Sequence, residues 1–262
     1  MSWRKYLIIP QLIWHGVRAP KDQTKAWDHF WSRVRKTGPG GEVLWDAASQ
    51  AELDTILGHL DAHMDRALPV VDVGCGNGRF SRLLAARFPK VLGIDAAPSA
   101  IEHARNESRA VANVSFRVAD AAAPDAGAQI ASELGDANVF IRGVLHVLTH
   151  ERRLAFVENL RAILGARGTL YFTETNIEGN PLDHLEFQGA TLTSMPDPLY
   201  RCVAAGIRPP DHFGEAQLHT YFPADRWEIL DRGKTAAHGV PLHPGVERED
   251  IPSFFALVRP RG

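Results

Sequence analysis

The chain has 262 residues, enough to bury one substantial core, and its 45% hydrophobic and 23% charged residues are typical of a globular protein. A net charge of −2 gives no general case for nucleic-acid binding, and two cysteines exclude a disulfide framework. No apolar run in the sequence reaches the length needed to cross a bilayer. These features favour an enzyme in a reducing compartment, and we expect a cytoplasmic location.

The N-terminal segment differs from the rest of the chain. Residues 1–40 carry a net charge of +6, and five of the six tryptophans lie within the first 45 residues. We interpret residues 1–64 as a helical lid, in which Trp27, Phe30 and Trp31 lie at helical spacing. A basic segment rich in Trp, Leu and Ile can also lie on an anionic membrane surface, so a peripheral contact through residues 1–20 stays open.

A glycine-rich stretch, DVGCGNG at residues 72–78, follows an apolar run and precedes an amphipathic helix expected at 80–88. The next short strand, 91–94, ends in Asp95, 21 positions after Gly74. Glycines allow a tight turn and a close approach to a ligand, and the helix start offers free N–H groups. A carboxylate at the tip of the second strand can accept hydrogen bonds from two ribose hydroxyls. This order predicts a site for a nucleoside-bearing cofactor.

Further elements alternate along the chain, as in an α/β fold. Ser99 and Glu102 fit a capping box that would start the next helix. We expect strands at 114–118, 139–141, 169–175, 227–230 and 254–258, and helices at 151–164 and 215–221. Residues 176–214 contain many breakers but also many apolar residues, which indicates a structured insertion after the fifth strand.

The glycine spacing favours one family over the dinucleotide-binding enzymes. Arg79 stands where the dinucleotide pattern needs its third glycine. The acid-x-G-x-G-x-G order instead resembles the first motif of the class I S-adenosylmethionine-dependent methyltransferases, and the resemblance covers most of residues 68–175 together with 227–259. It implies a doubly wound, mostly parallel seven-stranded Rossmann-like sheet in a methyltransferase domain at 65–262. It also implies S-adenosylmethionine as cofactor and S-adenosylhomocysteine as product.

The resemblance assigns roles to individual residues. Asp72 would help to hold the glycine loop and the methionine end of the cofactor, Asp95 would accept the ribose hydroxyls, and Asp120 would accept the adenine amino group. The complete predicted cofactor set is Asp72, Gly74, Gly76, Gly78, Asp95, Ala96, Asp120, Ala121, Arg142 and Trp31.

The acceptor site would lie beyond the fourth strand, where His146 follows directly. A hydroxyl acceptor needs a base that works near neutral pH, and His146 is our candidate. A carboxylate acceptor would need no base but would favour a cation, which Arg142 or the basic lid could supply. The resemblance makes 176–214 a cap over the acceptor, and its apolar residues favour a small hydrophobic molecule, which we expect to be methylated at oxygen. The other interpretation of this segment is a patch that seals the edge of the sheet or a dimer contact.

The sequence disfavours some other classes of protein and leaves others open. Residues 142–145 lack the Asn/Asp-Pro-Pro-aromatic motif of enzymes that methylate amino groups of bases, which disfavours a DNA partner. Asp120 and Glu174 do not make a convincing Mg²⁺ set, and no metal is expected. The alternatives that remain are a methyltransferase of RNA or protein, a protein that binds the cofactor without turnover, and a nicotinamide dehydrogenase. The acceptor's identity and the oligomeric state stay open.

Overall fold

The computed structural model describes residues 20–262, apart from 48, 180, 192–194 and 244. The segment predicted to touch a membrane, 1–20, lies outside the described residues except for Pro20. Within the described part of the chain, none of the helices combines the length and the apolar character needed to cross a membrane.

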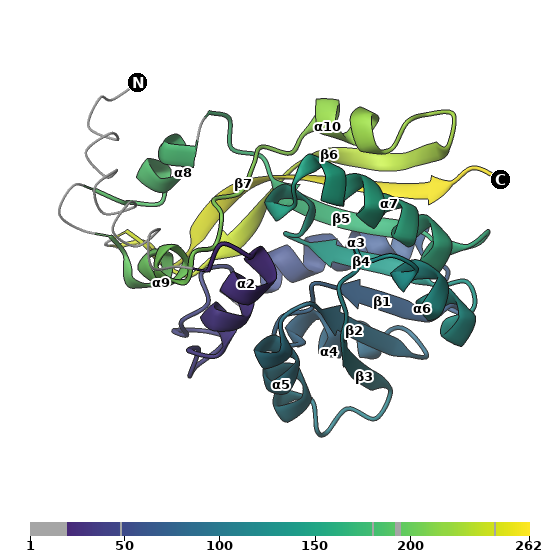
Figure 1. Ribbon diagram of the computed structural model, residues 1–262, viewed down its shortest axis with the longest axis horizontal. Helices are drawn as coiled ribbons and strands as arrows, with labels where there is room; N and C mark the ends of the chain where they lie inside the picture. The colour runs from purple at the N-terminus through teal and green to yellow at the C-terminus, as the bar shows by residue number, and fades with distance from the viewer. Residues whose placement is uncertain (1–19, 48, 180, 192–194, 244) are drawn as a thin grey trace.

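A seven-stranded sheet forms the centre of the protein (Figure 1). Its strand order is β3-β2-β1-β4-β5-β7-β6; β7 runs antiparallel to both of its neighbours, β5 and β6, and the other paired strands are parallel. The strands are β1 (Val70–Val73), β2 (Val91–Asp95), β3 (Val114–Val118), β4 (Asn138–Arg142), β5 (Leu170–Thr175), β6 (Trp227–Gly239) and β7 (Glu249–Pro260). The predicted α/β class and the mostly parallel, Rossmann-like sheet are confirmed.

Helices cover both faces of the sheet because successive strand residues point to opposite sides. The helices are α3 (Gln50–His63), α4 (Arg79–Ala85), α5 (Pro98–Glu107), α6 (Ala126–Leu134), α7 (His150–Leu164) and α10 (Glu215–Tyr221). In β1, Val71 and Val73 pack with α6, α7 and α10, whereas Val70 packs with α3 and α4. Phe116 on β3 shares the second face with α5.

The structure shifts several predicted boundaries, and two of the shifts have a clear physical cause. The final hairpin is much longer than the apolar runs 227–230 and 254–258, because β6 pairs with β7 from Trp227↔Pro260 to Gly239↔Glu249. Helix α5 begins at Pro98 rather than after Ser99, since proline suits the first helical position. The Ser99 N–H donates instead to Asp28 of another helix, at 2.8 Å.

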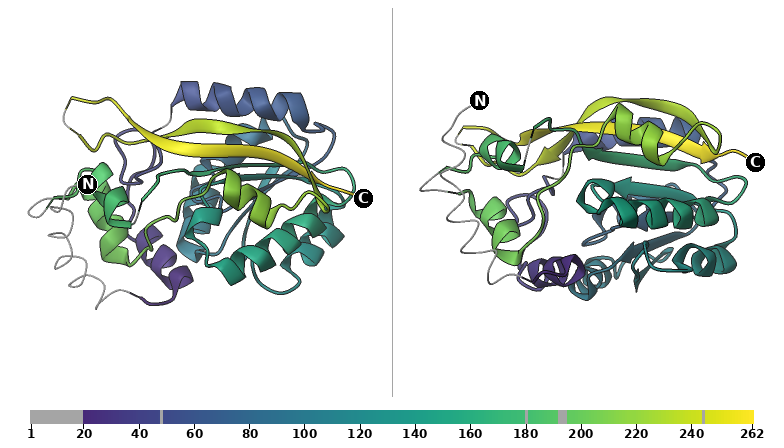
Figure 2. Two further views of the ribbon diagram at one scale, coloured as in Figure 1. Left: turned by 90° about the horizontal axis from the view of Figure 1, so that it is seen from above. Right: turned by 45° about the horizontal axis from the view of Figure 1, so that its top comes forward.

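Two distant segments form a roof at one end of the sheet, where Figures 1 and 2 show α2 beside α9. The roof helices are α2 (Gln23–Trp31), α8 (Pro181–Phe187) and α9 (Asp197–Ala205). Trp27, Phe30 and Trp31 of α2 gather around Trp45, with ring centroids 5.4–6.4 Å from it. The segment predicted as a lid, 1–64, is thus divided in its described part: α2 belongs to the roof, whereas α3 packs on the sheet.

A buried ion pair joins α3 to the sheet. Arg142 Nε donates to Glu52 Oε1 at 2.6 Å, and both side chains are less than a tenth exposed. The same guanidinium donates to the carbonyls of Trp45 and His238, at 3.0 and 3.4 Å, while Glu52 Oε2 accepts the His238 N–H at 3.1 Å. The pair therefore connects the N-terminal segment, β4 and the final hairpin.

Removing one member of this pair should destabilise the fold strongly, because the other charge would stay buried without its partner. We expect Glu52→Ala to lower the free energy of unfolding by about 3–5 kcal/mol. Urea denaturation checks this. Glu158→Ala is the control: it breaks the exposed pair with Arg226 and should cause a much smaller loss. Equal losses in the two variants would contradict the prediction.

Candidate functional site

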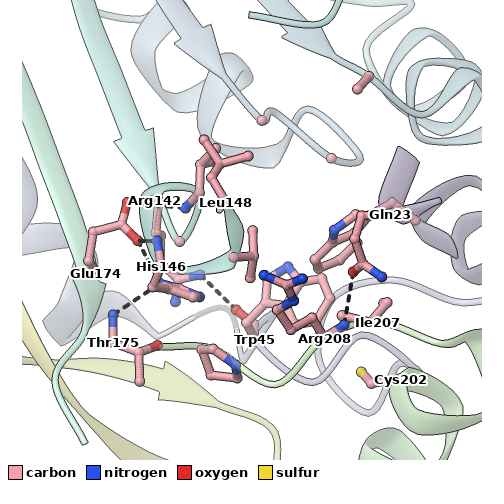
Figure 3. Close-up of a pocket in the computed structure, with 18 of the residues that line it drawn as sticks. Gln23, Trp45, Arg142, His146, Leu148, Glu174, Thr175, Cys202, Ile207 and Arg208 are labelled. Atoms are coloured by element: carbon pink, nitrogen blue, oxygen red, sulfur yellow. Dashed lines mark hydrogen bonds and ion pairs between the residues drawn. The ribbon is translucent and has the colours of Figure 1, made fainter. Parts of the chain in front are cut away.

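A cavity of about 480 Å³ lies between the roof and the carboxyl ends of the parallel strands (Figure 3). Its walls come from the loops that follow β1 to β4, from the end of β5, and from both roof segments. This volume is in the range of small-molecule sites, and the carboxyl edge is where open α/β sheets bind ligands. Of the predicted site residues, Asp72 and Gly78 do not line it; the others do.

The glycine loop enters the cavity wall in a conformation that suits glycine. Gly74 and Gly76 have φ of +73° and +53°, in the left-handed region. A Cβ atom on Gly76 would lie 2.8 Å from the Trp31 ring, and one on Gly74 would lie 2.4 Å from Val144. Side chains at these positions would therefore displace both the roof and the loop after β4. Trp31 thus lies against the loop, and its predicted contact with the cofactor stays a prediction.

Asp95 lies at the end of β2 and faces the cavity, where it is only partly exposed. Its Oδ2 accepts the Gly76 N–H at 3.0 Å, and its Oδ1 accepts the Ala97 N–H at 2.9 Å. Burial raises the pKa of this carboxyl, while these N–H groups oppose the rise. The side chain is thus held beside the glycine loop with lone pairs left for ribose hydroxyls, which supports the predicted role.

Asp72 lies beneath the loop rather than in the main cavity, with 2% of its surface exposed. It accepts a hydrogen bond from the Ser81 hydroxyl of α4 at 2.5 Å. Burial is the largest cause that raises its pKa, to about 7. Asp72 therefore ties β1 to α4 under the loop, and its predicted contact with the methionine end of the cofactor stays a prediction.

The predicted adenine contacts, Asp120 and Ala121, follow β3, and Ala96 follows β2. Asp120 accepts the Ala122 N–H at 3.0 Å, and both of its oxygens lie 2.7 Å from Nη2 of Arg152. Sequence reasoning did not select Arg152, which lines the cavity from the start of α7. The Asp120 carboxylate thus reaches the cavity with a guanidinium already beside it.

Arg142 lines the cavity, but its positive charge is already paired within the protein. Its guanidinium binds Glu52 and two backbone carbonyls, as described above. The expectation that Arg142 could supply a free cation to a carboxylate acceptor was therefore wrong, since the positive charge is already neutralised. What Arg142 does is hold Trp45 and the final hairpin against the cavity wall.

His146 lies in the short 3-10 helix η2 (Leu145–Val147) and lines the cavity. Its Nδ1 lies 2.5 Å from Glu174 Oε2, and the Thr175 backbone N–H points at the same Nδ1 in hydrogen-bond geometry, at 3.2 Å. Two unprotonated acceptors 2.5 Å apart would repel each other, so we assign the proton to Nδ1, donating to the carboxylate, in preference to the tautomer in which Nδ1 accepts from Thr175. Among the described residues, Nε2 has no hydrogen-bond partner, so its lone pair is available to a ligand.

Glu174 is the residue that sequence reasoning missed in this pair. Its buried carboxylate also accepts the N–H groups of Val144, Leu145 and His146, at 3.1, 2.9 and 3.1 Å. An acid at the end of β5, next to the strand that precedes His146, was the signal that could have found it. In the described part of the chain no three His, Cys, Asp or Glu side chains group as they would around a metal ion.

The carboxyl-edge cavity, the glycine loop and Asp95 together define a nucleoside-cofactor site of the methyltransferase type. Residues 70–168 match the family model described as "Methyltransferase domain". A solved structure of a SAM-dependent methyltransferase from Anabaena variabilis ATCC 29413 is 30% identical, with a TM-score of 0.81, and the alignment covers 93% of this chain and 97% of that one. This chain therefore belongs to the S-adenosylmethionine-dependent methyltransferases, which sets aside the dehydrogenase alternative, and its cofactor is S-adenosylmethionine.

Two further relatives match less well, one because the alignment is short and the other because the sequence identity is low. A malonyl-[acyl-carrier protein] O-methyltransferase from Acetivibrio thermocellus is 42% identical over 72 residues, which is 26% of this chain and 24% of that protein. This chain thus matches about a quarter of the length of that curated relative. The N-methyltransferase NodS of Bradyrhizobium japonicum WM9, solved with S-adenosylhomocysteine, is 15% identical with a TM-score of 0.55, covers 92% of this chain and all of its own, and shows the fold alone.

The residues present fit the cofactor. Glycines 74 and 76 leave no side chain in the cavity wall, and Asp95 offers an acceptor carboxylate beside them. Asp120 offers a second carboxylate one strand further along the sheet. We expect these groups to hold the loop side, the ribose and the adenine of the cofactor, respectively.

Loss of the Asp95 carboxylate should weaken cofactor binding. Charged hydrogen bonds contribute about 1.5–3 kcal/mol each, so Asp95→Ala should reduce affinity for S-adenosylhomocysteine about 10- to 100-fold or more. Isothermal titration calorimetry measures this. Asp54→Ala, on the exposed face of α3, is the control and should bind normally. Unchanged affinity in Asp95→Ala would overturn the ribose assignment.

Burial of Asp72 makes a prediction about pH. Its pKa of about 7 in the folded protein exceeds the ordinary value of 3.8, so between these values the folded state holds a proton that the unfolded state has lost. The free energy of unfolding therefore falls as pH rises, by up to about 1.4 kcal/mol per pH unit. Asp72→Asn should remove this slope in urea titrations between about pH 4 and about pH 7, whereas Asp54→Asn should retain it.

Proposed function

We propose that this enzyme transfers the methyl group of S-adenosylmethionine to the hydroxyl oxygen of a small, hydrophobic acceptor. The observation that carries the proposal is the pair formed by His146 and Glu174 at the cavity wall. A base near neutrality serves a hydroxyl acceptor, whereas a carboxylate is already ionised and needs none.

The pair has the arrangement of an oriented general base. Nδ1–H donates to Glu174, which fixes the ring orientation and leaves Nε2 as the basic nitrogen. Glu174 is itself fixed by three backbone N–H groups, so its carboxylate can stabilise a protonated imidazole without moving. This is the logic of a nucleophile–base–orienter set, with the acceptor hydroxyl as the nucleophile.

In the proposed reaction, His146 Nε2 takes the acceptor's hydroxyl proton as the oxygen forms its bond to the methyl carbon. S-adenosylmethionine supplies that methyl group as an electrophile, and the carbon–sulfur bonding pair stays on sulfur in S-adenosylhomocysteine. Glu174 stabilises the imidazolium until its proton passes to solvent. The roof limits access of water and orients the acceptor for in-line attack.

The cap supports a hydrophobic acceptor. Leu185, Leu199, Val203 and Ile207 line the cavity from the insertion, and Leu185 and Leu199 are almost fully buried. Such walls stabilise apolar ligands by removing apolar surface from water. The short match to an O-methyltransferase of Acetivibrio thermocellus is consistent with an oxygen acceptor.

The first experiment incubates the enzyme with S-adenosylmethionine labelled in its methyl group and a whole-cell extract. Partition then separates solvent-soluble, water-soluble and macromolecular products. Label in the solvent fraction supports the proposal. Label in RNA or protein would replace it with the macromolecular alternative, and S-adenosylhomocysteine binding without any transfer would favour a non-catalytic protein.

His146→Ala should lower turnover by about 10²- to 10⁴-fold, because proton removal would lose its base. Binding of S-adenosylhomocysteine should change little, which separates a catalytic from a structural effect. His150→Ala is the matched control: His150 is bonded to Tyr221 on α10 and does not line the cavity. Normal turnover in His146→Ala would show that His146 is not the base, and a carboxylate acceptor, which needs no base, would then be the better proposal.

A further inference from the structure

One glutamine joins the two segments that form the roof over the acceptor end of the cavity. Gln23 of α2 donates through Nε2 to the Gly206 carbonyl at 3.1 Å, and its Oε1 accepts the Arg208 N–H at 2.9 Å. Figure 3 shows Gln23 close to Ile207 and Arg208, which follow α9. The backbone at Arg208 is therefore fixed to helix α2, although the two segments are about 180 residues apart in sequence.

Arg208 differs from the other arginines of the cavity wall. Arg142 is paired with Glu52 and Arg152 with Asp120. Arg208 is one of the residues that line the cavity; its side chain is exposed, and its guanidinium makes no ion pair or hydrogen bond with any described residue. Lys21 also lines the cavity, is exposed and pairs with no described residue, but a planar guanidinium can bind a carboxylate through two N–H groups, which an ammonium cannot match. Arg208 is thus the guanidinium of the cavity wall that is available to an anion.

A second polar group of the cap is also unsatisfied. Gln188 follows α8, is only 3% exposed and lines the cavity. Its Oε1 is buried and accepts no hydrogen bond from the described residues. An unsatisfied buried acceptor costs about 1–3 kcal/mol, which a ligand can recover only by bringing a donor. A carboxamide oxygen cannot donate, so the ligand group must be a hydroxyl or an N–H.

From this combination we infer that the acceptor is an organic acid with an apolar body: its carboxylate binds Arg208, and a donor group other than the methylated hydroxyl binds Gln188. The inference rests on the proposed function and names the substrate class of the same site. A carboxylate is favoured over a phosphate, because a group of nearly two charges would lose more hydration against Leu199, Val203 and Ile207. The methylated hydroxyl is a separate group, facing His146.

The test measures binding, so it does not depend on turnover. The protein is saturated with S-adenosylhomocysteine and titrated calorimetrically with 4-hydroxyphenyl and 3,4-dihydroxyphenyl alkanoic acids and with 3-hydroxy and 3,5-dihydroxy fatty acids. Each acid is compared with its neutral dimethylamide. We expect at least one acid to bind about tenfold or more tightly than its dimethylamide, as a charge-assisted pair requires.

Three variants locate the effect. Arg208→Gln should remove the preference for the acid, while the matched variant Lys21→Gln, which removes a charge from the same cavity wall, should keep it. Gln188→Leu should remove the preference for the dihydroxy over the monohydroxy acid. S-adenosylhomocysteine affinity, measured in each variant, shows whether the cavity is intact.

The proposal is overturned if no acid in the panel binds more tightly than its dimethylamide. It is also overturned if Arg208→Gln keeps the preference, or if Lys21→Gln loses it equally, because a general positive potential would then explain the result. Acid binding that depends on Arg208 without methyl transfer would support this inference while refuting the proposed function. Methyl transfer to a neutral acceptor, with no preference for acids, would support the proposed function while refuting this inference.

Discussion

The Glu174 carboxylate lies buried at the end of β5, and three successive N–H groups of the loop after β4 donate to it. This contact sets the shape of the loop that carries His146, and the same carboxylate orients the imidazole. A buried carboxylate is tolerated only where donors surround it, and here four do. The position of the candidate base and its tautomer therefore have one physical cause.

A second constraint acts at the end of the neighbouring strand, β4. Arg142, at the end of β4, holds Glu52, Trp45 and His238 together, so it fixes the N-terminal segment against the final hairpin. Trp45 then completes the aromatic cluster of α2, whose Trp31 covers Gly76. Helix α2 is thereby held against the sheet through the Arg142–Glu52 ion pair as well as by the packing of its tryptophans. Breaking it would disturb the cofactor loop and the roof together.

Local sequence patterns sufficed for the cofactor half of the site. The glycine loop and Asp95 lie within 24 residues, in one strand–helix–strand unit, so chain geometry alone brings them together. The parallel strands could be predicted because buried strands read as short apolar runs. Predictions failed where pairing or packing decided: the outer part of β6 is held by its ladder with β7, and the Ser99 N–H is bound by Asp28 of α2.

The sequence by itself determined the α/β class, the cofactor and the position of His146, since each depends on residues close together in the chain. Only the tertiary structure decided which charges remain available to a ligand. In the sequence, Arg142 and Asp120 both look like free charged groups. In the structure, Arg142 pairs with Glu52, 90 positions away, and Asp120 pairs with Arg152, 32 positions away. Whether a charge is neutralised depends on through-space neighbours, and strand order and helix packing bring those neighbours together.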